Sequence, residues 1–192
     1  MTEGGDGWDC EIRTHHDPPA HRFKGEISKS LRLPVIVQPA LLDPRPSRRT
    51  GWNGASATPF LNQVDRRSSR GTVFSVGITE ENIVPGAYWN YLFGYAYLGM
   101  PSCVVTLHQM SSDDPAMALL VKRAAAIAIH EIVHNCGLDH HGYDDGIDCV
   151  MTADTPLDCL ERLDEGTHKF CRECLARGGA QARQEIVNDS VP

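Results

Sequence analysis

Residues 130–140 read HEIVHNCGLDH, which matches the pattern H-E-x-x-H-x-x-G-x-x-H. On a helix, residues four positions apart lie on one face, so His130 and His134 would present their imidazoles to the same point. Gly137 can adopt the left-handed conformation that ends a helix and reverses the chain, which would bring His140 back beside them. Three protein ligands with a fourth position open is the arrangement of catalytic zinc. The stretch therefore predicts a zinc ion held by these three histidines.

Glu131 occupies the position between the first two histidines that a catalytic carboxylate needs. It lies one residue round the helix from His130, close enough to reach a zinc-activated water without being a ligand itself. Zinc lowers the pKa of such a water and polarises a scissile carbonyl, and a neighbouring carboxylate can take the proton. We therefore predict that Glu131 is the general base of a zinc-dependent hydrolase.

The apolar surroundings of the motif argue against a chance match on a polar helix face. Residues 124–129 read AAAIAI, and Ile132 and Val133 interrupt the motif, so this half of the helix is apolar nearly all round. Such a helix belongs in a protein interior. Unpaired imidazoles and a carboxylate would each be costly there, whereas a shared metal ion would satisfy them. The metal site is therefore the favoured interpretation.

Length and charge restrict the class of protein. At 192 residues the chain suits one domain with its own core. Its formal net charge of −7 gives no basic footprint for nucleic acid or an anionic membrane. No segment is long enough for a membrane span, and the N-terminal stretch lacks the apolar core of a signal peptide. Seven cysteines, three of them in a zinc-like pattern, indicate a reducing setting. We expect a cytoplasmic monomer.

The hydrophobic pattern predicts an α/β domain. Residues 1–30 are polar and without periodicity, so we expect a mobile tail there and a single domain over 31–192. Asp114 and Pro115 should cap and open the zinc helix, and the strand before it should form one wall of a cleft above it. The expected strands are 33–37, 72–78 and 103–107, and the expected helices are 52–67, 114–136, 154–163 and 175–187.

A second group of possible metal ligands follows the motif. The chain contains Cys149-x-Met151 and then Cys171-x-x-Cys174. Two thiolates on one tight turn can share a zinc ion. A redox pair is the usual alternative for C-x-x-C, but no thioredoxin-like βαβ context surrounds it, which favours a metal.

Together these motifs resemble the archaemetzincins, a family of metzincin zinc peptidases. That family joins the extended zinc motif to a following cysteine, a C-x-M and a C-x-x-C. The stretches VGIT at 76–79, FGYA at 93–96 and VV at 104–105 also look like its upstream blocks, and the resemblance extends over residues 33–176. It implies a metzincin-like α+β fold, with a small mixed sheet packed on the long zinc helix. It also implies two zinc ions, one catalytic and one structural, and a short-peptide substrate, with aminopeptidase action suggested. Met151 resembles the methionine of the Met-turn, whose role is packing.

The chain departs from the family pattern at the second site. His141 stands where the family has a cysteine, and the spacing to Cys149 is longer. A set of His141, Cys149, Cys171 and Cys174 is still good zinc chemistry, so we expect a structural zinc there. Cys159 is a rival fourth ligand, although a small buried thiol is its simpler role.

We therefore expect a zinc metallopeptidase. Tyr143 could polarise a substrate carbonyl, but a solvent-facing loop tyrosine is the simpler interpretation. Two other functions stay open: a zinc-stabilised binding protein of the same fold with little turnover, and a zinc hydrolase of non-peptide amides. The presence of Glu131 argues against the first of these, because a purely structural site has no need of it.

Overall fold

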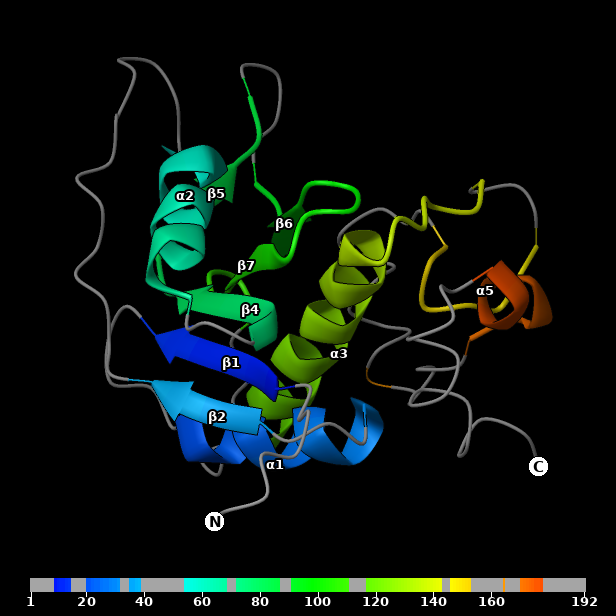
Figure 1. The fold of residues 1–192 in the computed structure, drawn as a ribbon, viewed down its shortest axis with the longest axis horizontal. Coiled ribbons are helices and arrows are strands. Elements are labelled where there is room, and N and C mark those ends of the chain that lie inside the picture. The colour runs from blue at the N-terminus through cyan, green and yellow to red at the C-terminus, as the bar shows by residue number, and fades with distance from the viewer. Residues whose placement is uncertain are drawn as a thin grey trace, which may run out of the picture.

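A mixed sheet organises the fold. The computed structural model describes residues 9–14, 20–31, 35–38, 54–68, 72–86, 91–110, 117–142, 146–152, 164 and 170–177. The strands of the five-stranded sheet are β1 (Asp9–Thr14), β2 (Val35–Gln38), β4 (Thr72–Thr79), β6 (Gly94–Ala96) and β7 (Ser102–Thr106). They lie in the order β2-β1-β4-β7-β6 (Figure 1), and β6 pairs antiparallel with β7 while the other described pairs are parallel. The predicted small mixed sheet is confirmed.

Several predicted elements appear with shifted ends. The strands expected over 33–37, 72–78 and 103–107 are β2, β4 and β7, and the helix expected over 52–67 is α2 (Ala57–Arg67). Before α2 lies the short strand β3 (Ala55–Ser56), which pairs with β5 (Ile83–Val84). Neither of these two-residue strands was predicted, because a two-residue strand is too short to show an alternating pattern.

The prediction of a mobile tail over residues 1–30 is wrong for the part that the structure describes. Strand β1 lies between β2 and β4, and helix α1 (Ala20–Leu31) packs on α3. Ile12, Phe23 and Ile27 are fully buried. The signal was the spacing of Phe23 and Ile27, four residues apart on one helix face, which the polar residues around them concealed.

The zinc helix begins later than predicted. Helix α3 runs from Ala118 to Asn135, and Met117 precedes it in a left-handed conformation with φ 55°. The described helix therefore starts after Met117 and not at the predicted cap, Asp114. Asp114 and Pro115 lie outside the described residues. The prediction relied on the strongest capping sequence, whereas the residue that directly precedes the helix is the left-handed Met117.

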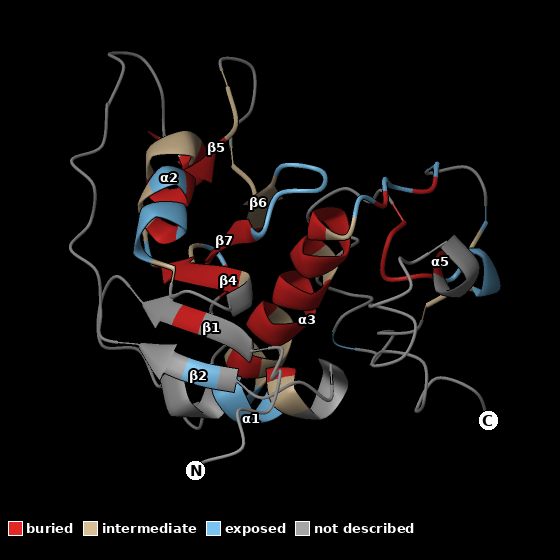
Figure 2. Ribbon diagram, viewed as in Figure 1, coloured by how far each residue is buried: buried red, intermediate tan, exposed pale blue. Residues whose placement is uncertain are grey.

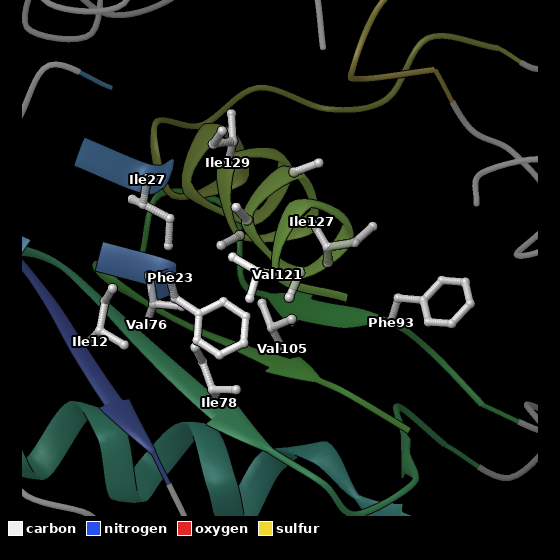
Figure 3. Close-up of a cluster of buried hydrophobic side chains, with 14 of the residues drawn as sticks. Ile12, Phe23, Ile27, Val76, Ile78, Phe93, Val105, Val121, Ile127 and Ile129 are labelled. Atoms are coloured by element: carbon white, nitrogen blue, oxygen red, sulfur yellow. The ribbon is translucent and has the colours of Figure 1, made fainter. Parts of the chain in front are cut away.

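Helices cover both faces of the sheet. Figure 1 shows α3 with α1 on one side and α2 on the other. The larger core lies between the sheet, α1 and α3, where Phe23, Ile78, Val105 and Val121 meet (Figure 3). A smaller cluster including Phe60 and Val104 lies under α2. Figure 2 shows the resulting burial, which is nearly continuous along α3, β4 and β7.

The C-terminal part forms a separate cluster beyond α3. Val133, Leu138, Val150, Met151 and Cys174 pack together there. Helix α5 (Arg172–Arg177) begins before the helix predicted over 175–187 and overlaps only its first residues, and the rest of that predicted helix and the helix predicted over 154–163 lie outside the described residues. Among the described helices, none has the length and apolar character that crossing a membrane requires.

Candidate metal centre

The end of α3 turns the chain back toward the helix. The Gly137 N–H donates to the carbonyl of His134 at 2.8 Å, and the Leu138 N–H donates to the carbonyl of Val133 at 3.3 Å. Gly137 has φ 83°. This pair of bonds with a left-handed glycine is a Schellman motif, and Leu138 packs in the same apolar cluster as Val133. The reversal predicted for Gly137 is therefore confirmed.

The reversal brings three imidazoles together. The Nε2 atoms of His130 and His140 lie 3.0 Å apart, and each lies 3.1 Å from Nε2 of His134. Ligand atoms of a tetrahedral zinc ion with bonds of about 2.0 Å lie roughly 3.3 Å from one another. The triangle in this protein is close to that size, so the three nitrogens fit a shared ion.

Two backbone carbonyls fix which ring nitrogen faces the centre. Nδ1 of His130 lies 2.7 Å from the oxygen of Val150, and Nδ1 of His134 lies 2.7 Å from the oxygen of Leu138. Each carbonyl can only accept, so each Nδ1 carries the proton and each Nε2 keeps its lone pair. Facing lone pairs repel unless a cation lies between them, and this argues for a metal.

Burial also favours the neutral, ligating form of the imidazoles. It lowers the pKa of His134, although the carbonyl of Leu138 opposes the shift. The pKa of His140 is lowered first by burial and then by the neighbouring His134. Asp139 lies 3.7 Å from Nδ1 of His140. Neutral imidazole is the form that binds metal ions.

Glu131, which follows His130 in helix α3, is buried. Its exposed fraction is only 6%, and burial raises the pKa of its carboxyl group to about 8. Its side chain lies directly against Gly94 of strand β6.

The strand that precedes the zinc helix was predicted to form one wall of a cleft above that helix. This strand, expected over 103–107, is β7, but β7 lies inside the sheet and β6 is the strand at the described edge. Strand β6 was not predicted, because it lies in an aromatic and glycine-rich stretch.

The second predicted ligand set also comes together. Nε2 of His141 lies 3.0 Å from Sγ of Cys174 and 3.1 Å from Sγ of Cys171, and Sγ of Cys149 lies 3.7 Å from Sγ of Cys174. All four ligand atoms lie within 4.8 Å of one another. One nitrogen and three sulfurs at these separations are a donor set that zinc prefers. Cys159 and Tyr143 lie outside the described residues.

Backbone N–H groups surround the sulfurs of this cluster. Sγ of Cys149 accepts from the N–H groups of Met151 at 3.5 Å and Cys171 at 3.3 Å, and Sγ of Cys171 accepts from the Cys174 N–H at 3.4 Å. Burial would raise the pKa of Cys171, but hydrogen bonds from the Cys174 N–H and from the thiols of Cys149 and Cys174 lower it overall. Burial raises the pKa of Cys149 and Cys174. A bound cation would offset the cost of ionising these two thiols.

Sequence reasoning did not find the carbonyl groups that orient the histidines. Met151, predicted as a packing residue, is fully buried in the C-terminal cluster. Its neighbour Val150 supplies the acceptor for His130. The C-x-M spacing could have drawn attention to this turn, but a backbone carbonyl has no signature in the side-chain sequence.

Three comparisons bear on this arrangement. The model of peptidase family M54 matches residues 65–178, which is more than half of the chain. The search of curated proteins gave no match. Among solved structures, the chain is similar to the archaemetzincin of Methanopyrus kandleri, with 22% identity and a TM-score of 0.71 over 91% of this chain and 94% of that one.

Two further structures share the fold. The archaemetzincin of Archaeoglobus fulgidus, complexed with malonate, is 22% identical with a TM-score of 0.72 over 88% of this chain and 99% of that one. A zinc-dependent peptidase from Methanocorpusculum labreanum is 20% identical with a TM-score of 0.69 over 88% and 98%. The fold is therefore that of the archaemetzincins. The chain belongs to peptidase family M54 and is an archaemetzincin-like zinc metallopeptidase.

Proposed function

We propose that this peptidase hydrolyses peptide bonds with a zinc ion held by His130, His134 and His140, and with Glu131 as general base. The observation that carries the proposal is the triangle of Nε2 atoms at 3.0–3.1 Å, together with the burial of Glu131, the residue that follows His130. When bound, zinc supplies Lewis-acid activation of a water molecule and of the substrate carbonyl.

The side chains of this chain carry the remaining steps. A carboxylate of Glu131 accepts a proton from the attacking water and later delivers it to the leaving amine nitrogen. Its burial supports this role, because a poorly hydrated carboxylate is more basic than an exposed one. The carbonyls of Val150 and Leu138 hold the rings of His130 and His134 in one orientation, so that both Nε2 atoms stay directed at the ion.

Strand β6 supports a short peptide as the substrate. It lies at the edge of the described sheet, it is antiparallel to β7, and its first residue contacts Glu131. An extended peptide can add to such an edge through main-chain hydrogen bonds. This would bring a scissile bond close to the general base. Aminopeptidase action is the narrower possibility, and it would require recognition of a free N-terminal amine.

We propose a second, structural zinc ion for the protein. Its ligands would be His141, Cys149, Cys171 and Cys174, whose ligand atoms lie within 4.8 Å of one another. With four protein ligands this site has no open position, which suits a structural ion and not a catalytic one. It would join the turn at Cys149 to helix α5. A cytoplasmic location, a monomeric state and the lack of a nucleic-acid partner stay predictions from the sequence.

Activity profiling tests the proposed function. The zinc-loaded protein and a His134→Ala variant would be incubated with a library of short peptides, with and without blocked N-termini, and the products identified by mass spectrometry. We expect cleavage by the wild type and none by the variant, and loss of cleavage on blocked peptides would indicate aminopeptidase action. Binding of peptides without any cleavage would favour a zinc-stabilised binding protein. Hydrolysis of non-peptide amides alone would favour a zinc hydrolase that does not act on peptides.

A further inference from the structure

Gly94 lies unusually close to Glu131. A Cβ atom built on Gly94 would lie 2.4 Å from Oε1 of Glu131, 2.7 Å from its Cγ and 2.8 Å from its Cδ. These are the three nearest atoms, and all belong to one side chain. Any residue other than glycine at this position would therefore overlap the carboxylate that we propose as general base.

The backbone at position 94 does not itself require glycine. Gly94 begins a regular strand and is paired with Val105 in an antiparallel register. Among the described glycines, positive φ angles occur at Gly99, Gly137 and Gly146, and Gly94 is not one of them. Because an L-residue could adopt its conformation, the missing side chain is what matters at this position.

The alternation of strand β6 explains why position 94 meets Glu131. Gly94 and Ala96 pair with Val105 and Cys103, both in the core cluster on the α3 side of the sheet. Tyr95 packs with the cluster under α2, on the opposite side. Successive side chains of a strand point to opposite faces, so position 94 faces α3, the helix that carries Glu131.

We infer that Gly94 is a positioning residue for the general base: the space left by its missing side chain holds the Glu131 carboxylate against strand β6. This inference rests on the proposed role of Glu131 in catalysis. Only glycine leaves room for the carboxylate at this position. Strand β6 therefore restricts where the carboxylate of Glu131 can lie relative to the three histidines.

The overlap would be relieved in a particular way. The atoms that obstruct a Cβ at position 94 all lie beyond the Cβ of Glu131, so rotation about its Cα–Cβ bond can move them at lower cost than the sheet can move. We therefore expect Gly94→Ala to lower kcat by about 10²-fold, as for a displacement of about 1 Å in a reacting group. KM and zinc content should stay close to wild type, since Glu131 is not proposed to bind substrate or zinc.

Two glycines provide matched controls. A Cβ on Gly77 would lie 2.4 Å from Cγ2 of Val64, which is fully buried, so Gly77→Ala should lower Tm while kcat per folded molecule is unchanged. A Cβ on Gly86 would meet nothing within 4 Å, so Gly86→Ala should change neither quantity. Gly94→Ala should show the opposite pattern to Gly77→Ala, with a large effect on kcat and a small one on Tm.

A stability cycle tests the contact without reference to activity. The Tm values of wild type, Gly94→Ala, Glu131→Ala and the double variant would be measured on the zinc-loaded protein. We expect Gly94→Ala to lower Tm by about 2–5 °C in the wild-type background and not at all in Glu131→Ala, whose truncated side chain leaves room for the methyl group. An equal loss in both backgrounds, or a Gly94→Ala protein that fails to fold, would overturn the inference.

A kinetic cycle tests the role of the contact. Gly94→Ala should reduce kcat strongly in the wild type and have little further effect in Glu131→Gln, because the two changes impair the same group. An undiminished effect in Glu131→Gln would overturn the positioning role. If Glu131→Gln alone kept the wild-type rate, the proposed function would fail instead, and a retained stability coupling would show that the contact still exists.

Discussion

The carbonyl oxygen of Val150 lies 2.7 Å from Nδ1 of His130. Val150 follows Cys149, whose sulfur belongs to the second ligand cluster, and precedes Met151, whose carbonyl accepts the N–H of His141 at 2.8 Å. One turn therefore carries a ligand of the second cluster and orients a ligand of the first. The two proposed zinc sites share this turn as well as the His140–His141 peptide bond.

This shared turn predicts that damage to the second site weakens the first. Cys171→Ala removes a ligand from the cluster and leaves the three histidines untouched. Loosening of the turn should lower the zinc affinity of the histidine site by about 10–100-fold, as expected when the orienting partner of a ligand is lost. Competition with a chelator of known affinity would measure this change.

A buried cysteine outside both clusters provides the control for that measurement. Cys103 is fully buried in the core between the sheet and α3. Cys103→Ala should lower stability while the affinity of the histidine site for zinc stays the same. Equal losses of affinity in the two variants would mean that general destabilisation, and not the shared turn, connects the sites.

Burial of Glu131 predicts a pH dependence of stability in the metal-free protein. Its pKa is raised from 4.5 to about 8, so the folded state holds this proton more tightly than the unfolded state. The stabilisation relative to Glu131→Gln is therefore present below about pH 4.5 and is lost as the pH rises toward about 8. The loss should be on the order of several kcal/mol. Urea unfolding of both metal-free proteins across this range would measure it, and parallel pH profiles would contradict the prediction.

Gly137 differs from Gly94 in that its conformation, and not its surroundings, requires glycine. It has φ 83°, and an added Cβ would meet nothing within 4 Å. Gly137→Ala should therefore lower the free energy of unfolding by about 1–2 kcal/mol, the cost of a left-handed alanine. Gly137→Asn should cost less, since asparagine tolerates this conformation. Chemical denaturation of the metal-free variants would measure the difference, and an asparagine variant no more stable than the alanine one would argue against this explanation.

The fourth ligand of the second site can be assigned by substitution. Nε2 of His141 lies within 3.1 Å of the sulfurs of Cys171 and Cys174. His141→Ala should remove the imidazole from the first shell seen by X-ray absorption and lower Tm, because metal binding of this type contributes to folding. Cys159→Ala should change neither. A shell of four sulfurs that persists without His141 would show that Cys159 is the ligand.

The sequence predicted the parts of the site that depend on local geometry. His130 and His134 are four residues apart on a helix, and Gly137 ends that helix with a positive φ, so their arrangement follows from residues close in the chain. The four members of the second cluster could also be named, because histidine and cysteine side chains carry the metal chemistry themselves.

The remaining features depend on contacts between distant residues. Strand β1 has six residues, with Ile12 as its described buried side chain, and its place between β2 and β4 is set by pairing that no local pattern shows. Strand β6 has three residues, and its contact with Glu131 depends on which face Gly94 presents to α3. The acceptor role of Val150 depends on a backbone group that every residue possesses.

The hydrolysis rate and zinc content of Glu131→Gln, measured on the same preparation, test the central claim most directly. Glutamine preserves the size of the side chain and removes its basicity. Because Glu131 is not a proposed ligand, zinc content should equal that of the wild type while kcat falls by about 10²–10⁴-fold. A variant that retains its zinc and also hydrolyses peptides at the wild-type rate would contradict the role of Glu131 as general base.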